Sequence, residues 1–221
     1  MRIRSVRRRT ALTAALARRT ALAAALAVLA ATAVGTTAAT ASATASATVT
    51  PPRFLSPSEL PPHASSPWYA SKVTPGLPDP EPFCLEGGVV PGGAGTYHRS
   101  YWTEYDTGAG QVGVVTSDDD SARRLAAKLR EKVARCAGDW LHDKPGGTAS
   151  WKDYGTVTAA DGGRVYGIHT SIPESEPGVH LFGVGRSGRT VTVVQWGEMG
   201  NLDQAPVPAF KATLRQALNK L

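Results

Sequence analysis

Apolar residues between Ser117 and Gly138 recur at steps of three and four positions, which is the spacing of one face of an α-helix. The apolar positions are Ala122, Leu125, Ala126, Leu129, Val133, Cys136 and Ala137. Ser117 or one of the aspartates after it is suited to cap the first turn, and Gly138 is expected to end the helix. The pattern therefore predicts an amphipathic helix over this segment.

A second helix is predicted at the end of the chain, over residues 206–220. One face of it is apolar and carries Val207, Phe210, Leu214, Ala217 and Leu218. Pro206 or Pro208 fits the first turn, where the missing N–H of proline costs nothing. We expect this helix to pack on the same side of a sheet as the first one.

Six further segments alternate apolar and polar residues or are rich in β-branched residues, which predicts strands. They cover residues 96–106, 111–117, 154–160, 164–171, 179–186 and 189–197. The links between them are short and rich in Gly, Pro and Asp, so consecutive strands must run antiparallel. The order β-β-α-β-β-β-β-α predicts an α+β fold, with two main helices packed on one face of an antiparallel sheet.

Gly183, Gly185 and Gly188 match the G-x-G-x-x-G pattern of dinucleotide-binding loops. Such a loop needs a helix that begins within the glycines. Residues 191–194 are instead β-branched and have no helical periodicity, which indicates a hairpin. Gly188 is expected to take a positive φ in the turn, and the other two glycines to be small strand positions or bulge sites. We therefore predict no nucleotide cofactor, and no other cofactor is expected.

The start of the chain has the pattern of a secretory signal peptide. Seven arginines without any acidic residue precede an apolar run over residues 21–34, and A-x-A sequences follow it. The run is shorter than the roughly 20 apolar residues that span a bilayer, so no stable membrane insertion is expected after cleavage. Residues 1–47 are predicted to be the signal peptide, cleaved near Ala43 or Ala47, and the protein to be secreted. Both general and twin-arginine export remain open.

Removal of the signal peptide changes the charge of the protein. The whole chain has 24 Lys+Arg and 18 Asp+Glu, and without the seven arginines 17 basic residues face 18 acidic ones. No basic surface suited to a nucleic-acid backbone is expected, so nucleic acid is excluded as a partner. Residues 48–82, rich in Pro, Ser and Thr, are predicted to be a partly flexible lead-in, and residues 83–221 a single domain. Within the lead-in, SPSELPP and the apolar Leu60 offer a surface that can dock on the domain.

Cys84 and Cys136 are the two cysteines of the chain. In an oxidising compartment an even pair is most simply explained by one disulfide. A thiol nucleophile is the alternative, but it gives the second cysteine no role. We therefore predict a Cys84–Cys136 disulfide.

The order of these elements resembles the extracellular sensor domain family of the mycobacterial kinase PknH. The matching pieces are LSPSELPP, Cys84 before the first hairpin, VGVVTSDDDSARRLAAKL leading into the helix with Cys136 and Trp140, and LFGVGRSGRTVTVVQWG. The resemblance implies an antiparallel sheet with helices on one face and a cleft on the other that receives an extracellular ligand. It also implies a free-standing secreted member of actinobacterial type, because the chain has no kinase segment.

The remaining residues favour binding over catalysis. The five histidines have no metal-ligand spacing, so no metal site is predicted, and GRSG around Ser187 is not a nucleophile elbow. The leading hypothesis is a secreted, non-catalytic ligand-binding or sensor-like module, monomeric, whose partner is an unknown small molecule or cell-envelope component. The alternatives are a hydrolase with a scattered Ser/His/Asp site and an inhibitor-like module that binds a protein. If one sheet face is open, its expected lining is His98, Trp102, Glu104 and His169, although Trp102 also fits the core.

Overall fold

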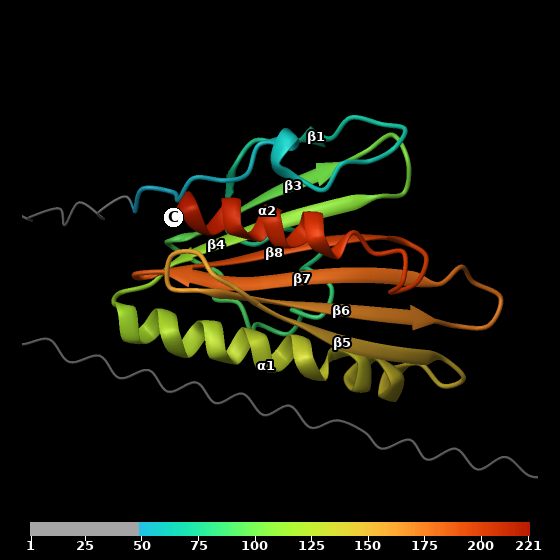
Figure 1. The fold of residues 1–221 in the computed structure, drawn as a ribbon. Helices are drawn as coiled ribbons and strands as arrows, with labels where there is room; N and C mark the ends of the chain where they lie inside the picture. Colours follow the sequence, from blue (N-terminus) through green and yellow to red (C-terminus); the bar gives the residue numbers. More distant parts are fainter. Residues whose placement is uncertain (1–48) are drawn as a thin grey trace, which may run out of the picture. The chain divides into compact units, whose positions relative to one another are not determined.

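The computed structural model describes residues 49–221, so the predicted signal peptide lies outside the described residues. The described chain begins with a short 3-10 helix, η1, and ends with helix α2 (Figure 1). The elements are η1 (Pro57–Glu59), β1 (Tyr69–Ala70), β2 (Thr74–Pro75), β3 (Thr96–Trp102), β4 (Gly108–Val115), α1 (Asp119–Asp143), β5 (Thr148–Val157), β6 (Gly163–Ser171), β7 (Gly178–Ser187), β8 (Thr190–Met199) and α2 (Val207–Asn219).

All strands belong to one antiparallel sheet. Its order is β1-β3-β4-β8-β7-β6-β5, and β2 pairs with the outer edge of β3. Apart from the two-residue strands β1 and β2, the elements follow the predicted order β-β-α-β-β-β-β-α. The predicted α+β class is confirmed.

The two helices cover opposite faces of this sheet. On β7, Phe182 and Val184 point into the core under α1, whereas Leu181 points into the core under α2. The prediction that both helices pack on one face is therefore wrong. The physical reason is visible in the strands themselves, because β8 buries five consecutive residues, Thr190 to Val194, and a strand buried on both faces loses its alternation. We call the two sides the α1 face and the α2 face.

The three motif glycines belong to the β7–β8 hairpin, as expected. Gly188 lies in the turn with φ of 52°. Gly183 and Gly185 lie on the α2 face, where an added Cβ would come within 2.9 Å of Leu214 and 2.6 Å of Leu218, respectively. These glycines therefore let α2 pack close to the sheet.

Helix α1 begins as predicted and ends later than predicted. The carboxylate of Asp118 accepts a hydrogen bond from the Ser121 backbone N–H at 2.7 Å, which caps the first turn. Gly138 does not end the helix, which continues to Asp143. A glycine ends a helix when its backbone turns left-handed, and Gly138 is not among the residues with positive φ.

Residues 49–62 cover the rest of the α2 face. The backbone of Leu55, a fully buried residue, donates to the side chain of Gln111 at 2.9 Å and accepts from the Tyr101 hydroxyl at 2.9 Å. Glu59 forms an ion pair with Lys220 near the end of α2 at 2.7 Å. This segment runs beside α2 and the C-terminus in Figure 1, so the expected docking of SPSELPP is confirmed.

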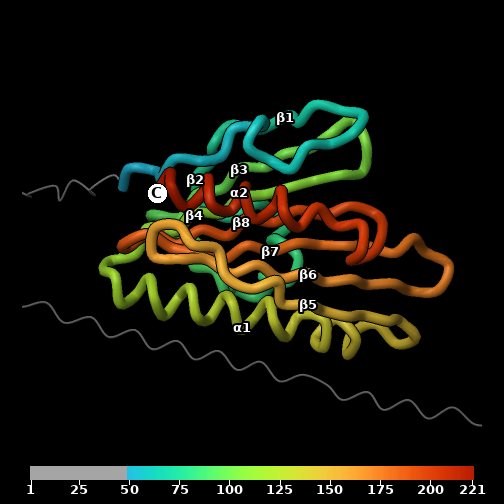
Figure 2. The backbone as a smooth tube through the Cα atoms, viewed as in Figure 1, coloured from blue at the N-terminus to red at the C-terminus, as the bar shows by residue number. Residues whose placement is uncertain are grey.

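Residues 76–92, which we call the strap, cover part of the α1 face. Figure 2 shows this segment passing behind the sheet, on the side away from α2. Its buried residues Cys84, Leu85 and Val90 belong to the same core as α1. Within residues 49–221, no helix is long and apolar enough to cross a membrane.

Candidate ligand-binding groove

The strap is fixed to the domain by the Cys84–Cys136 disulfide. The two Cα atoms lie 5.3 Å apart, within the usual range for a disulfide, and the prediction of this bond is confirmed. Cys136 lies on the buried side of α1, so the bond joins the strap to this helix. The strap lies over β3, β4 and β8 and leaves space between itself and these strands.

A first cavity of about 270 Å³ lies between the strap and these three strands. Its floor is the α1 face of the sheet, where the paired residues His98 and Val112 lie beside Val193. Its roof is formed by strap residues, and the apolar ones include Phe83 and Leu85. The cavity thus has an apolar body with polar groups at its border.

A second cavity of about 440 Å³ continues from the first toward the ends of the strands. The two cavities share Phe83, Ala109 and Gln195 as lining residues. The second also contacts His180 of β7 and the two loops that join β3 to β4 and β6 to β7. We call the two cavities together the groove.

His180 is the most unusual titratable group of the groove. Its ring packs against Phe83, with 4.6 Å between ring centroids, and lies on Gly197, where an added Cβ would come within 2.7 Å of Nδ1. Burial lowers the pKa of His180 from 6.5 to about 4, so the ring is neutral at physiological pH. A neutral imidazole offers one donor and one acceptor, and neither ring nitrogen has a hydrogen-bond partner within residues 49–221.

Gln195 is the second polar side chain of the groove without a protein partner. It is partly buried, lies at the junction of the two cavities, and its amide stands over Gly110, where a Cβ would come within 3.0 Å of Nε2. No residue in the described part of the chain hydrogen-bonds its side chain. Because partly buried amides normally find partners, the position is suited to a ligand or to water.

Carboxylates dominate the charged groups of the groove. Asp79 and Glu81 line the first cavity, and Asp106, Glu176 and Glu198 line the second. No lysine lines either cavity. The one arginine there, Arg99, directs its guanidinium to the other face, where it donates to the carbonyls of Ser71 and Leu55 at 2.9 and 2.8 Å.

The structure separates the four residues that the sequence analysis grouped. His98 lines the first cavity, where its Nδ1 is bonded to the Gly76 carbonyl at 2.9 Å. Trp102 lies on the same face but outside both cavities, 47 % exposed and stacked on Tyr69. Glu104 accepts a hydrogen bond from the Tyr69 hydroxyl in the same exposed cluster.

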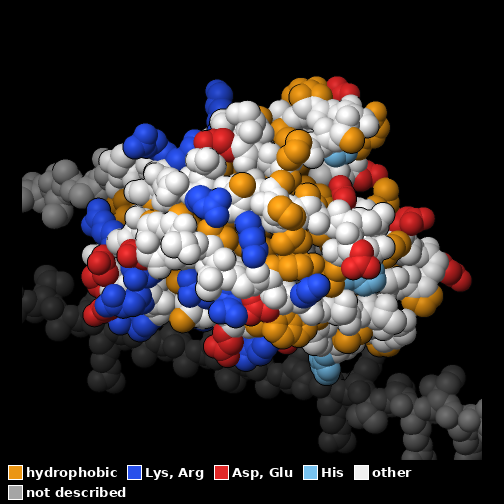
Figure 3. Space-filling model, viewed as in Figure 1, with side chains coloured by type: hydrophobic (Ala, Val, Ile, Leu, Met, Phe, Trp, Pro, Cys, Tyr) orange, Lys and Arg blue, Asp and Glu red, His pale blue; other side chains and the backbone are white. Residues whose placement is uncertain are grey.

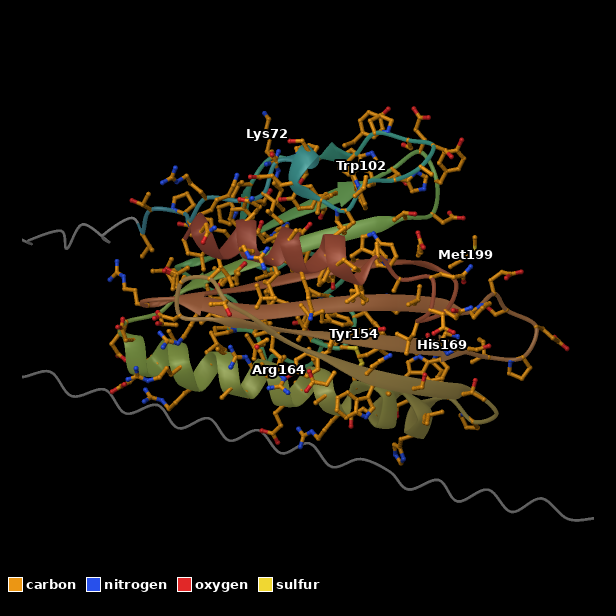
Figure 4. All side chains as sticks on the ribbon, viewed as in Figure 1. Lys72, Trp102, Tyr154, Arg164, His169 and Met199 are labelled. Atoms are coloured by element: carbon orange, nitrogen blue, oxygen red, sulfur yellow. A yellow bond between two sulfur atoms is a disulfide. The ribbon has the colours of Figure 1, made fainter. Side chains whose placement is uncertain are left out.

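His169 lies elsewhere. Its register partner Val179 belongs to the core under α2, so His169 faces the side of the sheet opposite His98. In Figure 4, His169 lies near one end of β6, far along the sheet from Trp102 on β3. These placements do not bring His98, Trp102, Glu104 and His169 into one site.

The sequence analysis missed Phe83, His180 and Gln195 as groove residues. His180 precedes Phe182 on the same face of one strand, and this two-residue spacing was the available signal. The spacing could not reveal the strap above them. Gln195 offered no signal, because it sits in a β-branched run in which a polar residue reads as solvent-exposed.

The described part of the chain contains neither a serine–histidine pair nor a cluster of metal ligands. No serine hydroxyl there is hydrogen-bonded to a histidine ring, and His98, which shares the first cavity with Ser100, is bonded to a backbone carbonyl instead. No group of three or more His, Cys, Asp or Glu side chains within residues 49–221 could hold a metal ion.

Comparisons with known proteins point to a resemblance among solved structures. No family model matches the sequence, and no curated protein matches it. Among solved structures, the chain is similar to the extracellular domain of PknH from Mycobacterium tuberculosis, with 14% identity and a TM-score of 0.39. The match covers 70% of this chain and 86% of that one. It is a weak resemblance at the level of the fold.

Proposed function

We propose that this protein is a secreted, non-catalytic module that binds a small ligand in the groove under the strap. The observation that carries the proposal is the pair of partly buried polar side chains, Gln195 and His180, that face the cavities without a protein partner. The polar atoms of both side chains reach the solvent of the groove, so a ligand can take the place of water on them. These groups supply hydrogen bonds and apolar contact, and binding is the role they support best.

Export is a separate part of the proposal. It is supported by the signal-peptide pattern before residue 48 and by the disulfide, which persists in oxidising compartments. The secreted protein is expected to begin between Thr44 and Thr50, and N-terminal sequencing of culture supernatant measures this start. A protein that stays in the cell fraction and begins at Met1 would contradict export.

Ligand binding can be tested by screening small molecules with amide NMR of the purified protein. We expect the molecules that bind to shift the amides of Gln195, His180 and Phe83. Gly110→Val would place a branched side chain on the floor of the first cavity, beneath the flexible Gln195, and should abolish these shifts. Gly138→Ala, at an exposed helix position with open space around it, is the matched control and should retain them.

The same screen can refute the proposed site. Shifts confined to the exposed cluster around Tyr69 and Trp102 would place binding outside the groove. Equal binding by the Gly110→Val variant would lead to the same conclusion.

A further inference from the structure

The ligand class follows from the charges around the groove, provided that the groove is the binding site proposed above. Three loops meet at the end of the sheet where the second cavity opens, because β3, β6 and β8 all end there. They are the β3–β4, β6–β7 and β8–α2 loops. Their sequences, TEYDT, IPESEP and GNLDQAP, contain five carboxylates and no lysine or arginine.

The surface shows the same asymmetry. In Figure 3, the right-hand end of the molecule shows Asp and Glu side chains without Lys or Arg, whereas Lys and Arg lie among acidic side chains at the centre and the left. The opposite ends of β7 and β8 carry Arg186 and Arg189, and Lys220 lies near Phe54 on that side. A ligand that enters the groove from the loop end therefore meets a negative potential.

Three carboxylates, Asp106, Glu176 and Glu198, bring this charge to the second cavity itself. Glu198 accepts a hydrogen bond from the Thr107 hydroxyl at 3.1 Å, whereas neither Asp106 nor Glu176 forms a side-chain hydrogen bond or an ion pair with any of residues 49–221. Carboxylates at the surface are often solvated in this way, but here they border a cavity that also contains an aromatic ring. Phe83 adds a π face that attracts cations.

The uncharged polar groups fit the same ligand. A neutral His180 ring and the Gln195 amide oxygen both accept hydrogen bonds, and an ammonium group has three donors and no acceptor. The first cavity, with Phe83, Leu85, Val112 and Val193, then provides apolar contact for the rest of the molecule. An anionic ligand would meet carboxylates at both ends of the groove, and the one lining cation, Arg99, directs its guanidinium to the other face.

We propose that the groove binds an organic cation, with its ammonium group between Asp106 and Glu176 beside His180 and its apolar body under the strap. This assignment rests on the proposed function and adds the chemical class of the ligand.

Three molecules with one carbon skeleton test the assignment: hexylamine, hexanol and hexanoate. Their dissociation constants can be measured by amide NMR titration of the purified protein. We expect hexylamine to bind about tenfold more tightly than hexanol, because two partly exposed ion pairs each contribute modestly, and hexanoate to bind most weakly. Added salt should weaken the binding of hexylamine and leave that of hexanol unchanged.

Variants identify the carboxylates that cause the preference for hexylamine. Asp106→Asn with Glu176→Gln should remove most of the advantage of hexylamine and leave hexanol binding intact. The matched control is Glu104→Gln with Glu174→Gln, which removes the same charge from the same two loops, at residues that line neither cavity. This control should keep the preference for hexylamine.

Each other outcome has a definite meaning. If hexanol or hexanoate binds in the groove as tightly as hexylamine, the cation assignment is wrong and the proposed function stands. If the control pair loses the preference for hexylamine to the same extent, the overall negative potential of this end of the sheet is responsible for it. That result would also overturn the assignment. If none of the probes shifts groove amides, both proposals fail. The salt dependence of the unmodified protein tests the assignment even if a variant does not fold.

Discussion

Two glutamines on neighbouring strands have opposite environments. Gln111 of β4 faces α2 and is 1 % exposed; its Oε1 accepts from the Leu55 backbone and its Nε2 donates to the Thr192 hydroxyl at 3.1 Å. Gln195 of β8 faces the strap and has no such partner within residues 49–221. The same side chain thus closes the structure on one face and is available to a ligand on the other.

The difference comes from what covers each face. On the α2 face, a helix and residues 49–62 pack directly onto the strands, and glycines allow the closest contacts. On the α1 face, the strap is fixed through Cys84 and leaves about 270 Å³ beneath it. The first arrangement stabilises the domain, and the second leaves space at a cost in packing.

Removing the disulfide should have the largest effect and should act mainly on the α1 face. Cys84→Ser with Cys136→Ser opens a loop with a sequence separation of 52 residues. The expected loss is about 4 kcal/mol of unfolding free energy in the chain-entropy model. Urea unfolding measures the loss, and the rate of amide hydrogen exchange should increase first in the strap. If the exchange rate increases first in residues 49–62, the disulfide does not act mainly on the α1 face.

Substitution of one glycine on each face allows a direct comparison of how tightly the two faces are packed. An added Cβ at Gly185 would meet Leu218 at 2.6 Å and the Gly162 carbonyl oxygen at 3.0 Å, whereas at Gly110 the nearest atoms belong to the flexible Gln195 side chain. We expect Gly185→Ala to cost about 2 kcal/mol and Gly110→Ala to be nearly neutral. Urea unfolding of both variants measures this difference. Equal costs would mean that the groove is packed as tightly as the α2 face.

The pKa of His180 predicts a smaller, pH-dependent effect. Because burial lowers this pKa to about 4, the unfolded chain takes up the proton first as the pH falls below 6.5. Stability is therefore lost between pH 6.5 and about 4, and this contribution is level below that range. We expect a loss of about 1 kcal/mol, since solvent in the groove moderates the effect.

The measurement compares the unmodified protein with His180→Gln over this pH range. The variant should lack this part of the pH dependence. Two identical profiles would show that the ring is not held neutral by burial.

The fold was predictable because its signals are local. The apolar stripe of α1, the β-branched run after Gly188 and the short polar links each specify one element, and together they determine the antiparallel order. The faces covered by the helices were not predictable in this way. A strand that is buried on both sides, such as β8, does not show which side receives which helix.

The groove was less predictable than the fold because it depends on contacts between distant segments. His98 could be identified from alternation along β3, and Cys84 and Cys136 from their number and the predicted signal peptide. Gln195 becomes significant only because the strap lies over it without bonding to it. No pattern within β8 records that arrangement.

The most direct test of the contrast between the faces combines stability and binding in Gln111→Met and Gln195→Met. Gln111→Met leaves the buried Leu55 N–H without its acceptor and removes the donor to the Thr192 hydroxyl, so it should lose about 3 kcal/mol of unfolding free energy and keep its affinity for hexylamine. Gln195→Met should change the unfolding free energy by less than about 0.5 kcal/mol and weaken hexylamine binding about fivefold. A Gln195→Met variant that is as strongly destabilised as Gln111→Met, with unchanged binding, would contradict the assignment of the groove as the binding site.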